Sequence, residues 1–404
     1  LDFIGAFLQA DARHRTFTIL PSEWAAVFPD LAEWFGKPLR LRKSLYGAVD
    51  SGKNWDEELD LWLTNVLQGF TRCPSEGSIY VKRTGNLFLF LLNAVDDMLY
   101  FSNCVDYRTR FEKELQARFS VDLIGQAHWY LQSRITQNTD FTISLDQFRY
   151  CALILARFIP SLSLTTISAE DSKRYAAPLP SEFIATTTDC SANRFEVMAL
   201  EAEFGFEYAS AIGMLVYLIN SYILLQFSVR KLAKYMQLPG RKHFIAVAHL
   251  LRHLRCNYLE YGLKFYPEIA LSPLYSLLKS IDFPGAPDDY PIIIFTDSSW
   301  QDCPDTSRST GCYLVYINGG LLEGASFVPT PVALSSAEAE YNACAHGVTG
   351  GMHVRQTYQS LRGLDPDTPL TMPLMVDSTS AIAMAKNGKD TRQTCHIRRR
   401  YHYV

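Results

Sequence analysis

Three acidic residues near the end of the chain lie where a strand or helix could direct each side chain inward. Asp297 follows the apolar run of IIIFTDSSW, Glu340 lies within LSSAEAEYNA, and Asp377 follows the apolar run of PLMVDSTSAIAM. Carboxylate oxygens suit Mg²⁺. A pair of metal ions can activate an attacking oxygen and stabilise a leaving one during phosphoryl transfer. The pattern indicates a metal-dependent phosphodiester site.

A second acidic constellation lies in the first part of the chain. It consists of Asp2 in LDFIGAFLQAD and the adjacent pair Asp96 and Asp97 in LLNAVDDMLYF. Adjacent carboxylates on a fixed turn repel each other, so they are either exposed or hold a divalent cation between them. The pair Asp288 and Asp289, in a proline-rich loop, shows that such a dipeptide also arises by composition alone. Two acidic sites in one polypeptide indicate a polymerase joined to a nuclease.

The elements that must position the first pair are strands. Leu87–Leu92 and Met98–Phe101 are apolar runs separated by Asn93–Asp97, which predicts two strands joined by a tight turn with the aspartates at its tip.

The C-terminal acids are expected at the ends of a strand, a helix and a second strand. The β-favouring run Ile292–Phe295 predicts a buried strand that ends near Asp297. Ser335 followed by Glu338 is a capping box that starts a helix, so Glu338 has a structural role. Glu340 lies about 200° around that helix from Glu338 and is free to face the sheet. The run before Asp377 predicts a further strand, and SAIAMA after it predicts a helix.

Length and composition indicate a globular protein of two or three domains. The chain has 404 residues, of which 48% are hydrophobic and 20% charged. Its formal net charge is −4, whereas nucleic-acid-binding domains usually carry a basic excess. A bound nucleic acid would therefore need a local basic stripe, although any such cluster can equally be a solvated face. The candidate clusters are Arg230, Lys231 and Lys234, then Arg241 and Lys242, and finally Arg398, Arg399 and Arg400.

Nine scattered cysteines without a Cys-x-x-Cys pair indicate reduced thiols and no zinc site. They favour an intracellular protein, cytoplasmic or nuclear and not secreted. No signal-peptide pattern surrounds the first residues, and the chain begins with Leu1, so we expect it to be part of a longer protein.

One uncharged stretch, Tyr208–Val229, is 22 residues long, close to the ~20 residues that a bilayer requires. Polar residues interrupt it, and no second span supports insertion, so we expect buried helix and no membrane association. The alternative, a membrane protein with one span, predicts detergent-dependent solubility.

The chain divides into regions of different composition. Residues 1 to 150 show an α+β pattern, with helical spacing over Asp56–Leu67 and Tyr107–Phe119. Residues 160 to 200, rich in Ser, Thr and Pro, predict a long connection. A helical section follows from Glu201 to about Arg255, broken at Pro239 and Gly240. Residues 281 to 291 predict a boundary before the last domain.

Several segments, taken in their order along the chain, resemble segments of one protein family. They are LDFIGAFLQAD, LRLRKSLYGAVDSGKNW, VDDMLYFSN, GQAHWYL, RKLAKYMQLPGRKHF, HLLRHL, TDSSW, SRSTGC, LSSAEAEYNA and HIRRRYHYV. Together they resemble the reverse transcriptase and ribonuclease H region of copia-type LTR retrotransposon Pol polyproteins, over essentially the whole chain.

The resemblance implies an α+β polymerase palm and thumb-like region followed by an α/β ribonuclease H-like domain with a mixed sheet. The expected palm covers residues 1–160, with the fingers missing. A linker and a thumb- or connection-like helical section would cover 161–280, and the ribonuclease H-like domain 281–404.

The resemblance also assigns the acids. Asp2 would be the first palm aspartate, and Asp96 and Asp97 the paired ones. Asp297 would bridge two metal ions that Glu340 and Asp377 help to hold. All six would be catalytic and metal-binding, with two Mg²⁺ ions expected at each active site. Expected nucleic-acid contacts are Tyr46, Gly47, Lys53, Arg241, Lys242, His396 and Arg399.

The implied function is to copy an RNA template into DNA from a DNA primer with deoxynucleotides, and to remove the RNA from the RNA/DNA hybrid. Integrase and protease would be polyprotein neighbours, and an oligomer is compatible with the resemblance. The chain departs from the family pattern at Ala94, where tyrosine is usual, and at Arg398, where an aspartate is common. The alternative is therefore a decayed, catalytically inactive retroelement fragment that at most binds nucleic acid.

Overall fold

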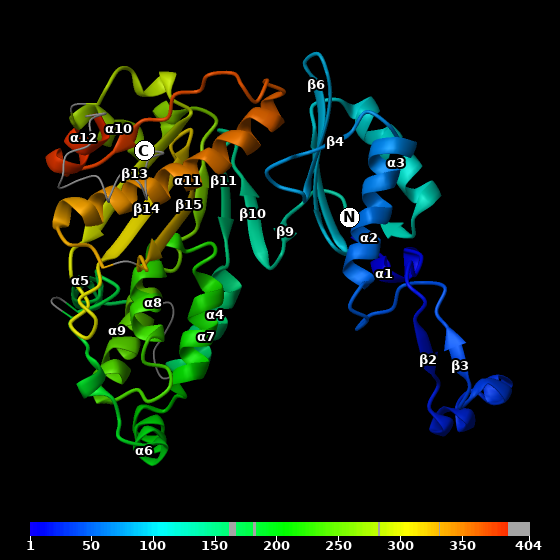
Figure 1. The fold of residues 1–404 in the computed structure, drawn as a ribbon, viewed down its shortest axis with the longest axis horizontal. Helices are drawn as coiled ribbons and strands as arrows, with labels where there is room; N and C mark the ends of the chain where they lie inside the picture. Colours follow the sequence, from blue (N-terminus) through cyan, green and yellow to red (C-terminus); the bar gives the residue numbers. More distant parts are fainter. Residues whose placement is uncertain (161–166, 181–182, 282, 331, 387–404) are drawn as a thin grey trace. The chain divides into compact units, whose positions relative to one another are not determined.

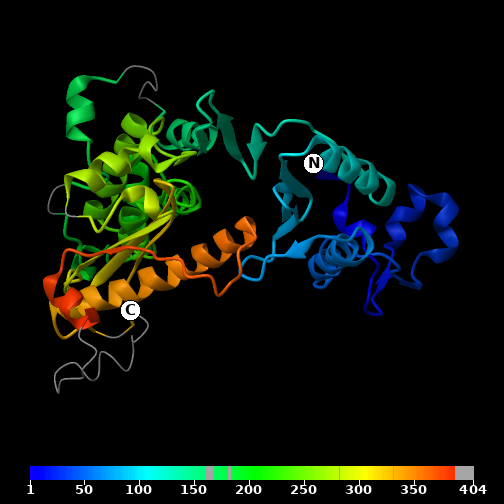
Figure 2. The same ribbon diagram turned by 90° about the horizontal axis from the view of Figure 1, so that it is seen from above.

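The computed structural model describes residues 1–160, 167–180, 183–281, 283–330 and 332–386. The chain forms two compact units, which can be followed by colour in Figure 1 and Figure 2. Unit 1 comprises residues 1–131 together with 356–368. Unit 2 comprises residues 132–355 together with those from 369 onward. The division into three domains at residues 160 and 280 stays a prediction.

A six-stranded sheet forms the centre of unit 1, in the order β4-β5-β6-β7-β1-β8. Leu89 and Leu91 of β6 are buried, whereas Phe90 between them is partly exposed, as expected for a sheet covered on one face. The strands are β1 (Asp2–Phe3), β4 (Thr71–Arg72), β5 (Ile79–Thr84), β6 (Leu87–Ala94), β7 (Asp97–Ser102) and β8 (Val121–Asp122).

Helices pack against the buried face of this sheet. Phe3, Trp55 and Phe119 form edge-to-face ring contacts, with centroids 4.9 to 5.8 Å apart, and join the helices to the sheet core. Burying each such ring contributes about 1.5–3 kcal/mol. The helices are α1 (Ala6–Gln9), α2 (Ser51–Leu61), which a π-helical turn over Trp62–Val66 continues, and α3 (Val105–Arg118); the short strand β9 (Trp129–Tyr130) follows.

A two-stranded ribbon, formed by β2 (Phe17–Ile19) and β3 (Pro38–Arg40), projects from the rest of unit 1 (Figure 1). Two 3₁₀ helices at its tip, Ser22–Ala26 and Pro29–Trp34, connect the strands. No residue from Ala12 to Lys43 is buried, so the ribbon contributes nothing to the core of unit 1.

Unit 2 contains a helical core. Its central members are α7 and α9, whose facing sides include the fully buried Leu215, Phe244 and Leu251. The helices are α4 (Phe148–Phe158), α5 (Ala169–Arg174), α6 (Arg194–Phe204), α7 (Tyr208–Leu218), α8 (Gln226–Ala233) and α9 (Arg241–Asn257). Antiparallel strands β10 (Ser133–Gln137), β11 (Ile143–Asp146) and β12 (Leu263–Phe265) accompany them, with 3₁₀ turns at Thr187–Asp189, Ile223–Leu225, Ile269–Leu271 and Pro287–Asp289.

A mixed sheet in the order β15-β14-β13-β16 forms the rest of unit 2. β13 pairs with β14 antiparallel and with β16 parallel, which confirms the expected mixed sheet. The elements are α10 (Pro273–Ser280), β13 (Ile292–Ser299), β14 (Thr310–Ile317), β15 (Gly320–Phe327), α11 (Ser336–Arg362), β16 (Leu374–Met375) and α12 (Thr379–Lys386). The last residues of α11, from Gln356 on, belong to unit 1.

Glycines bring α11 close to this sheet (Figure 1). A Cβ atom at Gly347 would overlap the Thr296 side chain of β13, and one at Gly351 would overlap Ile294 of the same strand. The helix therefore lies closer to β13 than larger residues would allow, and Glu340, two turns before Gly347, lies close to the strand that carries Asp297.

The sequence predicted most of these elements. The helices expected over Asp56–Leu67 and Tyr107–Phe119 are present as α2 with its π-helical turn and as α3, and α12 covers the SAIAMA segment. The expected boundary of the helical section was wrong. α6 begins at Arg194, inside the stretch interpreted as a connection, because Asn193 caps it through a hydrogen bond from Glu196 N at 3.1 Å. α5 lies in the same stretch.

The uncharged run from Tyr208 to Val229 is not one helix. It is divided among α7, the 3₁₀ turn Ile223–Leu225 and the start of α8, and many of its apolar residues, such as Leu215, Leu225 and Val229, belong to the helical core. Among the described residues, no helix combines the length and apolar character needed to span a membrane.

Candidate active sites

Three elements of unit 2 bring Asp297, Glu340 and Asp377 together. Asp297 lies near the end of β13. In the parallel pair of β13 with β16, Ile294 is opposite Leu374 and Phe295 is opposite Met375. Continuing this register by two residues places Asp377 beside Asp297. Glu340 reaches the same place from the first turns of α11.

Glu340 is the buried member of this group, with 8% of its surface exposed. Its Oε1 accepts hydrogen bonds from the Ser298 backbone N–H at 3.1 Å and from the Ser298 hydroxyl at 2.9 Å. Its Oε2 is buried and has no hydrogen-bond partner among the residues that the structure describes. Burial raises the pKa of Glu340, as do the neighbouring charges of Asp297 and Asp377, whereas the bonds from Ser298 oppose the rise.

The start of α11 is fixed by the cap that the sequence predicts. The Ser335 hydroxyl accepts a hydrogen bond from Glu338 N at 3.2 Å, and the Glu338 carboxylate accepts one from Leu334 N at 2.8 Å. Glu338 thus has the predicted structural role and Glu340 faces the sheet, since both Glu340 bonds come from β13.

The three carboxylates form a compact oxygen site. One oxygen from each of Asp297, Glu340 and Asp377 lies within 4.8 Å of the others, and both aspartates are exposed. A buried carboxylate oxygen without a partner costs free energy unless a cation or donor satisfies it. Hard oxygen ligands in this number suit Mg²⁺ better than softer metals. The residues present therefore fit a divalent cation that remains open to solvent on the side of the aspartates.

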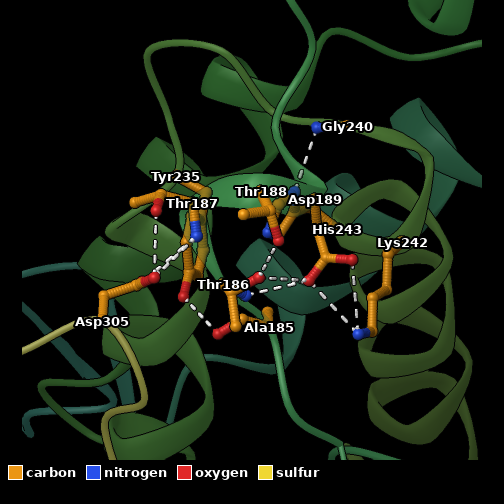
Figure 3. Close-up of polar contacts among 10 residues, drawn as sticks. All are labelled: Ala185, Thr186, Thr187, Thr188, Asp189, Tyr235, Gly240, Lys242, His243 and Asp305. Carbon is orange, nitrogen blue, oxygen red and sulfur yellow. Dashed lines mark hydrogen bonds and ion pairs between the residues drawn. The ribbon is translucent and has the colours of Figure 1, made fainter. Parts of the chain in front are cut away.

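The loop after β13 is held at both ends. The Trp300 indole donates to Ala333 O at 3.2 Å, and the Thr310 hydroxyl donates to Asp302 at 2.8 Å. Asp305 accepts hydrogen bonds from Thr187 N at 3.0 Å and from the Thr187 hydroxyl at 2.9 Å (Figure 3). These contacts anchor the connection that follows Asp297.

In unit 1 the paired aspartates lie on the predicted hairpin. β6 and β7 pair so that Ala94 is opposite Asp97, leaving Val95 and Asp96 as the turn. Val95 has a φ of 58°, a left-handed conformation that is costly for a β-branched residue. The Trp55 indole donates a hydrogen bond to Val95 O at 2.8 Å and helps to hold this turn.

Asp2 lies in the middle of a row of acids. It is opposite Asp97 of β7 on one side and opposite Asp122 of β8 on the other. Directly opposed residues of antiparallel strands have side chains on the same face. Burial raises the pKa of Asp97, and the charges of Asp2 and Asp96 raise it further. Unlike the acids of unit 2, Asp2, Asp96 and Asp97 do not bring their oxygens together within 4.8 Å in the described structure.

The segment that follows the ribbon contacts this turn through Tyr46. Ser44 is buried and accepts a hydrogen bond from Asn54 at 3.0 Å, which fixes the chain before Tyr46. The Tyr46 hydroxyl lies 3.3 Å from both carboxylate oxygens of Asp96. Gly47 has a φ of 90°, which a residue with a side chain rarely adopts. Lys53 is exposed and lies 3.7 Å from Glu57.

The other predicted nucleic-acid contacts divide into two groups. Arg241 donates two hydrogen bonds to Glu203, at 2.5 and 2.6 Å, and Lys242 lies 3.2 Å from Asp189 (Figure 3). Both cations therefore have acidic partners within unit 2. His396 and Arg399 lie outside the described residues, as does Arg398.

Sequence reasoning missed two residues of these sites. Ser298 holds Glu340, and the adjacent hydroxyls of TDSSW were the available signal. Asp122 lies beside Asp2 only because β8 pairs with β1, and no local pattern indicates that pairing.

Comparisons with known proteins find similar sequences over the whole chain. Residues 1–167 match the family model described as reverse transcriptase (RNA-dependent DNA polymerase). The chain is 25% identical over 413 residues to the retrovirus-related Pol polyprotein from transposon TNT 1-94 of Nicotiana tabacum, covering 100% of this chain and 27% of that protein. It is also 25% identical over 407 residues to the Pol polyprotein from transposon RE2 of Arabidopsis thaliana, covering 100% of this chain and 24% of that protein.

A more distant similarity is to the transposon Ty1-JR2 Gag-Pol polyprotein of Saccharomyces cerevisiae, at 22% identity over 404 residues, covering 97% of this chain and 20% of that protein. The chain thus spans only 20 to 27% of the length of these curated relatives. No solved structure matches the chain.

Proposed function

Because the chain belongs to the copia-type retrotransposon Pol polyproteins, with residues 1–167 in the reverse transcriptase family, we propose that it is an RNA-directed DNA polymerase with ribonuclease H activity. The polymerase palm would lie within residues 1–160, a thumb- or connection-like section within 161–280, and the ribonuclease H-like domain within 281–404. Phosphoryl transfer at both sites would use two divalent metal ions.

The observation that carries the nuclease part is the acidic group of unit 2. Asp297, Glu340 and Asp377 have oxygens within 4.8 Å of one another, and Glu340 Oε2 is buried without a hydrogen-bond partner from any described residue. Such a set is costly without a cation and well suited to Mg²⁺. Bound Mg²⁺ would lower the pKa of a coordinated water and stabilise charge on the leaving oxygen.

The residues around this set have distinct roles in the proposal. Asp297 and Asp377 are exposed, so they can hold the cation where a phosphodiester can reach it. Ser298 orients Glu340 through two hydrogen bonds, which keep one carboxylate oxygen fixed. The substrate would be the RNA strand of an RNA/DNA hybrid.

In the polymerase part, Asp2, Asp96 and Asp97 would hold the metal ions, and Tyr46 would position Asp96. Tyr46, Gly47 and Lys53 would contact the RNA template, the DNA primer and the incoming deoxynucleotide. Arg241, Lys242, His396 and Arg399 would contact the nucleic acid elsewhere. In the cell the chain would act in the cytoplasm or nucleus as part of a polyprotein with integrase and protease neighbours.

Hybrid cleavage by the purified chain in Mg²⁺ tests the nuclease part. Asp297→Asn should reduce cleavage at least ~100-fold, because removing a ligand charge disrupts the site. Asp288→Asn is the matched control, since Asp288 is an exposed acid of the same unit whose contact is with Tyr275. Equal rates for the wild type and Asp297→Asn, in folded protein, would contradict the proposal. Primer extension with Asp97→Asn tests the polymerase part in the same way.

A second candidate is a decayed fragment that binds nucleic acid without polymerase activity. It is favoured by the palm aspartates, whose oxygens do not gather as those of unit 2 do in the described structure, and by Ala94 opposite Asp97. Primer extension separates the two candidates: nucleic-acid binding without extension above the Asp97→Asn background supports the decayed fragment.

A further inference from the structure

The strands of the projecting ribbon carry a concentrated positive charge. We call the segments 12–20 and 37–43 the basic ribbon. It contains six cationic residues and no acid, in a chain whose formal net charge is −4. The tip between the segments is different in character, since its charged residues are the acids Glu23, Asp30 and Glu33. The cations of the basic ribbon are Arg13, Arg15, Lys37, Arg40, Arg42 and Lys43.

Three of these six cations already have an interaction partner within unit 1. Arg13 pairs with Glu57, Lys43 lies 2.7 Å from Asp11, and Lys37 lies over the Trp34 ring at 5.7 Å. Arg15, Arg40 and Arg42 are exposed and have neither an acidic partner nor a side-chain hydrogen bond in the part of the chain that the structure describes. Three guanidinium groups on one narrow element repel one another unless an anion lies between them.

An exposed aromatic ring lies directly among these cations. Phe17 is opposite Arg40 in the pairing of β2 with β3, and Ile19 is opposite Pro38, so these four residues share one face of the ribbon. Phe17 is 58% exposed and Ile19 is 61% exposed. No residue from Ala12 to Lys43 is buried, so the described chain does not cover this face.

Arginine side chains that alternate with an exposed aromatic ring suit a ligand that has both phosphate groups and unpaired bases. Guanidinium groups bind phosphate oxygens through paired hydrogen bonds, and aromatic rings stack on unpaired bases irrespective of sequence. An apolar protein partner would leave the three arginine charges without counter-ions, which charge complementarity disfavours. We propose that the basic ribbon binds a single nucleic-acid strand, with Arg15, Arg40 and Arg42 on its phosphates and Phe17 on a base.

Both ends of the basic ribbon join the palm. One end follows α1, which begins three residues after Phe3 of β1, and the other leads directly into Ser44 and Tyr46. Tyr46 in turn contacts Asp96. A strand bound along the ribbon would therefore pass toward the paired aspartates. This inference rests on the proposed function in one respect: only the proposed polymerase activity identifies the bound strand as the unpaired template.

Fluorescence anisotropy with labelled oligouridylate and oligothymidylate tests the ribbon in the full chain. The triple variant Arg15→Gln, Arg40→Gln, Arg42→Gln should bind at least ~10-fold more weakly, and the slope of log affinity against log salt should fall by about 2, from ~0.7 per lost phosphate contact. Phe17→Ser should weaken binding by about 5- to 100-fold with an unchanged slope, because it removes stacking and no charge.

Matched controls separate charge from folding. Arg110→Gln removes an exposed cation of unit 1 that is paired with Glu114 on α3, and it should leave the affinity unchanged. Replacing the three arginines by lysine keeps the charge and should restore most of the affinity. Circular dichroism of each variant checks that unit 1 remains folded.

The outcomes are decisive for the ribbon independently of catalysis. Unchanged affinity in the triple variant, or absence of strand binding by the wild type, would each overturn the inference. If the triple variant loses strand binding and the wild-type chain shows no primer extension, strand binding by the ribbon is established and the proposed polymerase activity is rejected. If the triple variant extends a primer as the wild type does and binds the strand with unchanged affinity, only the proposed role of the ribbon is rejected.

Discussion

Glu340 of α11 accepts two hydrogen bonds from Ser298 of β13, one from the backbone N–H at 3.1 Å and one from the hydroxyl at 2.9 Å. A single residue of the strand thus holds one oxygen of the buried carboxylate, while the other oxygen has no hydrogen-bond partner in the described structure. The two residues are far apart in sequence, and their contact orients the acidic group that carries the proposed nuclease activity.

Removing the Ser298 hydroxyl should weaken hybrid cleavage and shift its pH dependence. The hydrogen bonds from Ser298 oppose the rise in the pKa of Glu340 that burial causes. Ser298→Ala should therefore raise that pKa further, so that the acidic limb of the cleavage profile moves to higher pH and activity falls about 10-fold. Ser280→Ala, which removes an exposed hydroxyl of the same unit, should leave the profile unchanged. A profile identical for both variants would show that Ser298 does not tune Glu340.

Neutralising Glu340 should stabilise the metal-free protein at neutral pH. Its pKa is raised above the ordinary value of 4.5, chiefly by burial, so the protonated form favours the folded state. This contribution is present below pH 4.5 and is lost as pH rises through the raised value. Glu340→Gln should therefore melt at a higher temperature than the wild type at pH 7 in chelator, and the difference should close toward pH 4.5.

Added Mg²⁺ should reverse this order. A cation bound only by the folded wild type at 100 times its Kd adds about 2.7 kcal/mol to the free energy of unfolding. Glu340→Gln, which lacks one of the three carboxylates, should gain much less. Thermal melts of both proteins with and without Mg²⁺ measure this. Equal gains would mean that Mg²⁺ acts elsewhere on the chain.

Gly347→Ala should destabilise unit 2 although alanine is the better helix former. A Cβ at this position would overlap Thr296, so α11 must shift from β13 at a cost of about 1–3 kcal/mol. The shift should also reduce hybrid cleavage, since Glu340 lies on the same helix. Gly213→Ala in α7 is the control: no atom of the described residues lies within 4 Å of its Cβ position, and the change should stabilise the protein by about 0.5–1 kcal/mol. Urea unfolding of both variants decides between these effects.

Asn342→Leu should raise stability. Asn342 is fully buried, and within the described part of the chain neither the oxygen nor the nitrogen of its side-chain amide has a hydrogen-bond partner. Leucine has the same number of side-chain heavy atoms and no polar group, so about 1–3 kcal/mol of desolvation cost should be removed. Asn54→Leu is the contrasting variant, because the Asn54 amide donates to Ser44 at 3.0 Å and its loss leaves that hydroxyl without the bond. Stabilisation by Asn54→Leu, or destabilisation by Asn342→Leu, in urea unfolding would contradict this reasoning.

The sequence predicted those parts of the fold that depend on local patterns. The apolar runs on either side of Asn93–Asp97 predicted the hairpin of β6 and β7, and the β-favouring run from Ile292 predicted β13. The spacing of Ser335 and Glu338 predicted the start of α11 and left Glu340 free to face the sheet. Strand alternation, helix periodicity and capping each depend on neighbours within a few residues, which a sequence displays directly.

Only the tertiary structure decided which distant residues meet. The burial of Glu340 against Ser298, the position of Asp122 beside Asp2, and the pairing of Arg241 with Glu203 each join different elements. The exposed face of the basic ribbon likewise depends on the pairing of Phe17 with Arg40. The sequence by itself determined the kinds of chemical group and the elements that carry them. Their contacts depend on sheet order and helix packing, which depend on the packing of the whole chain and on no local pattern.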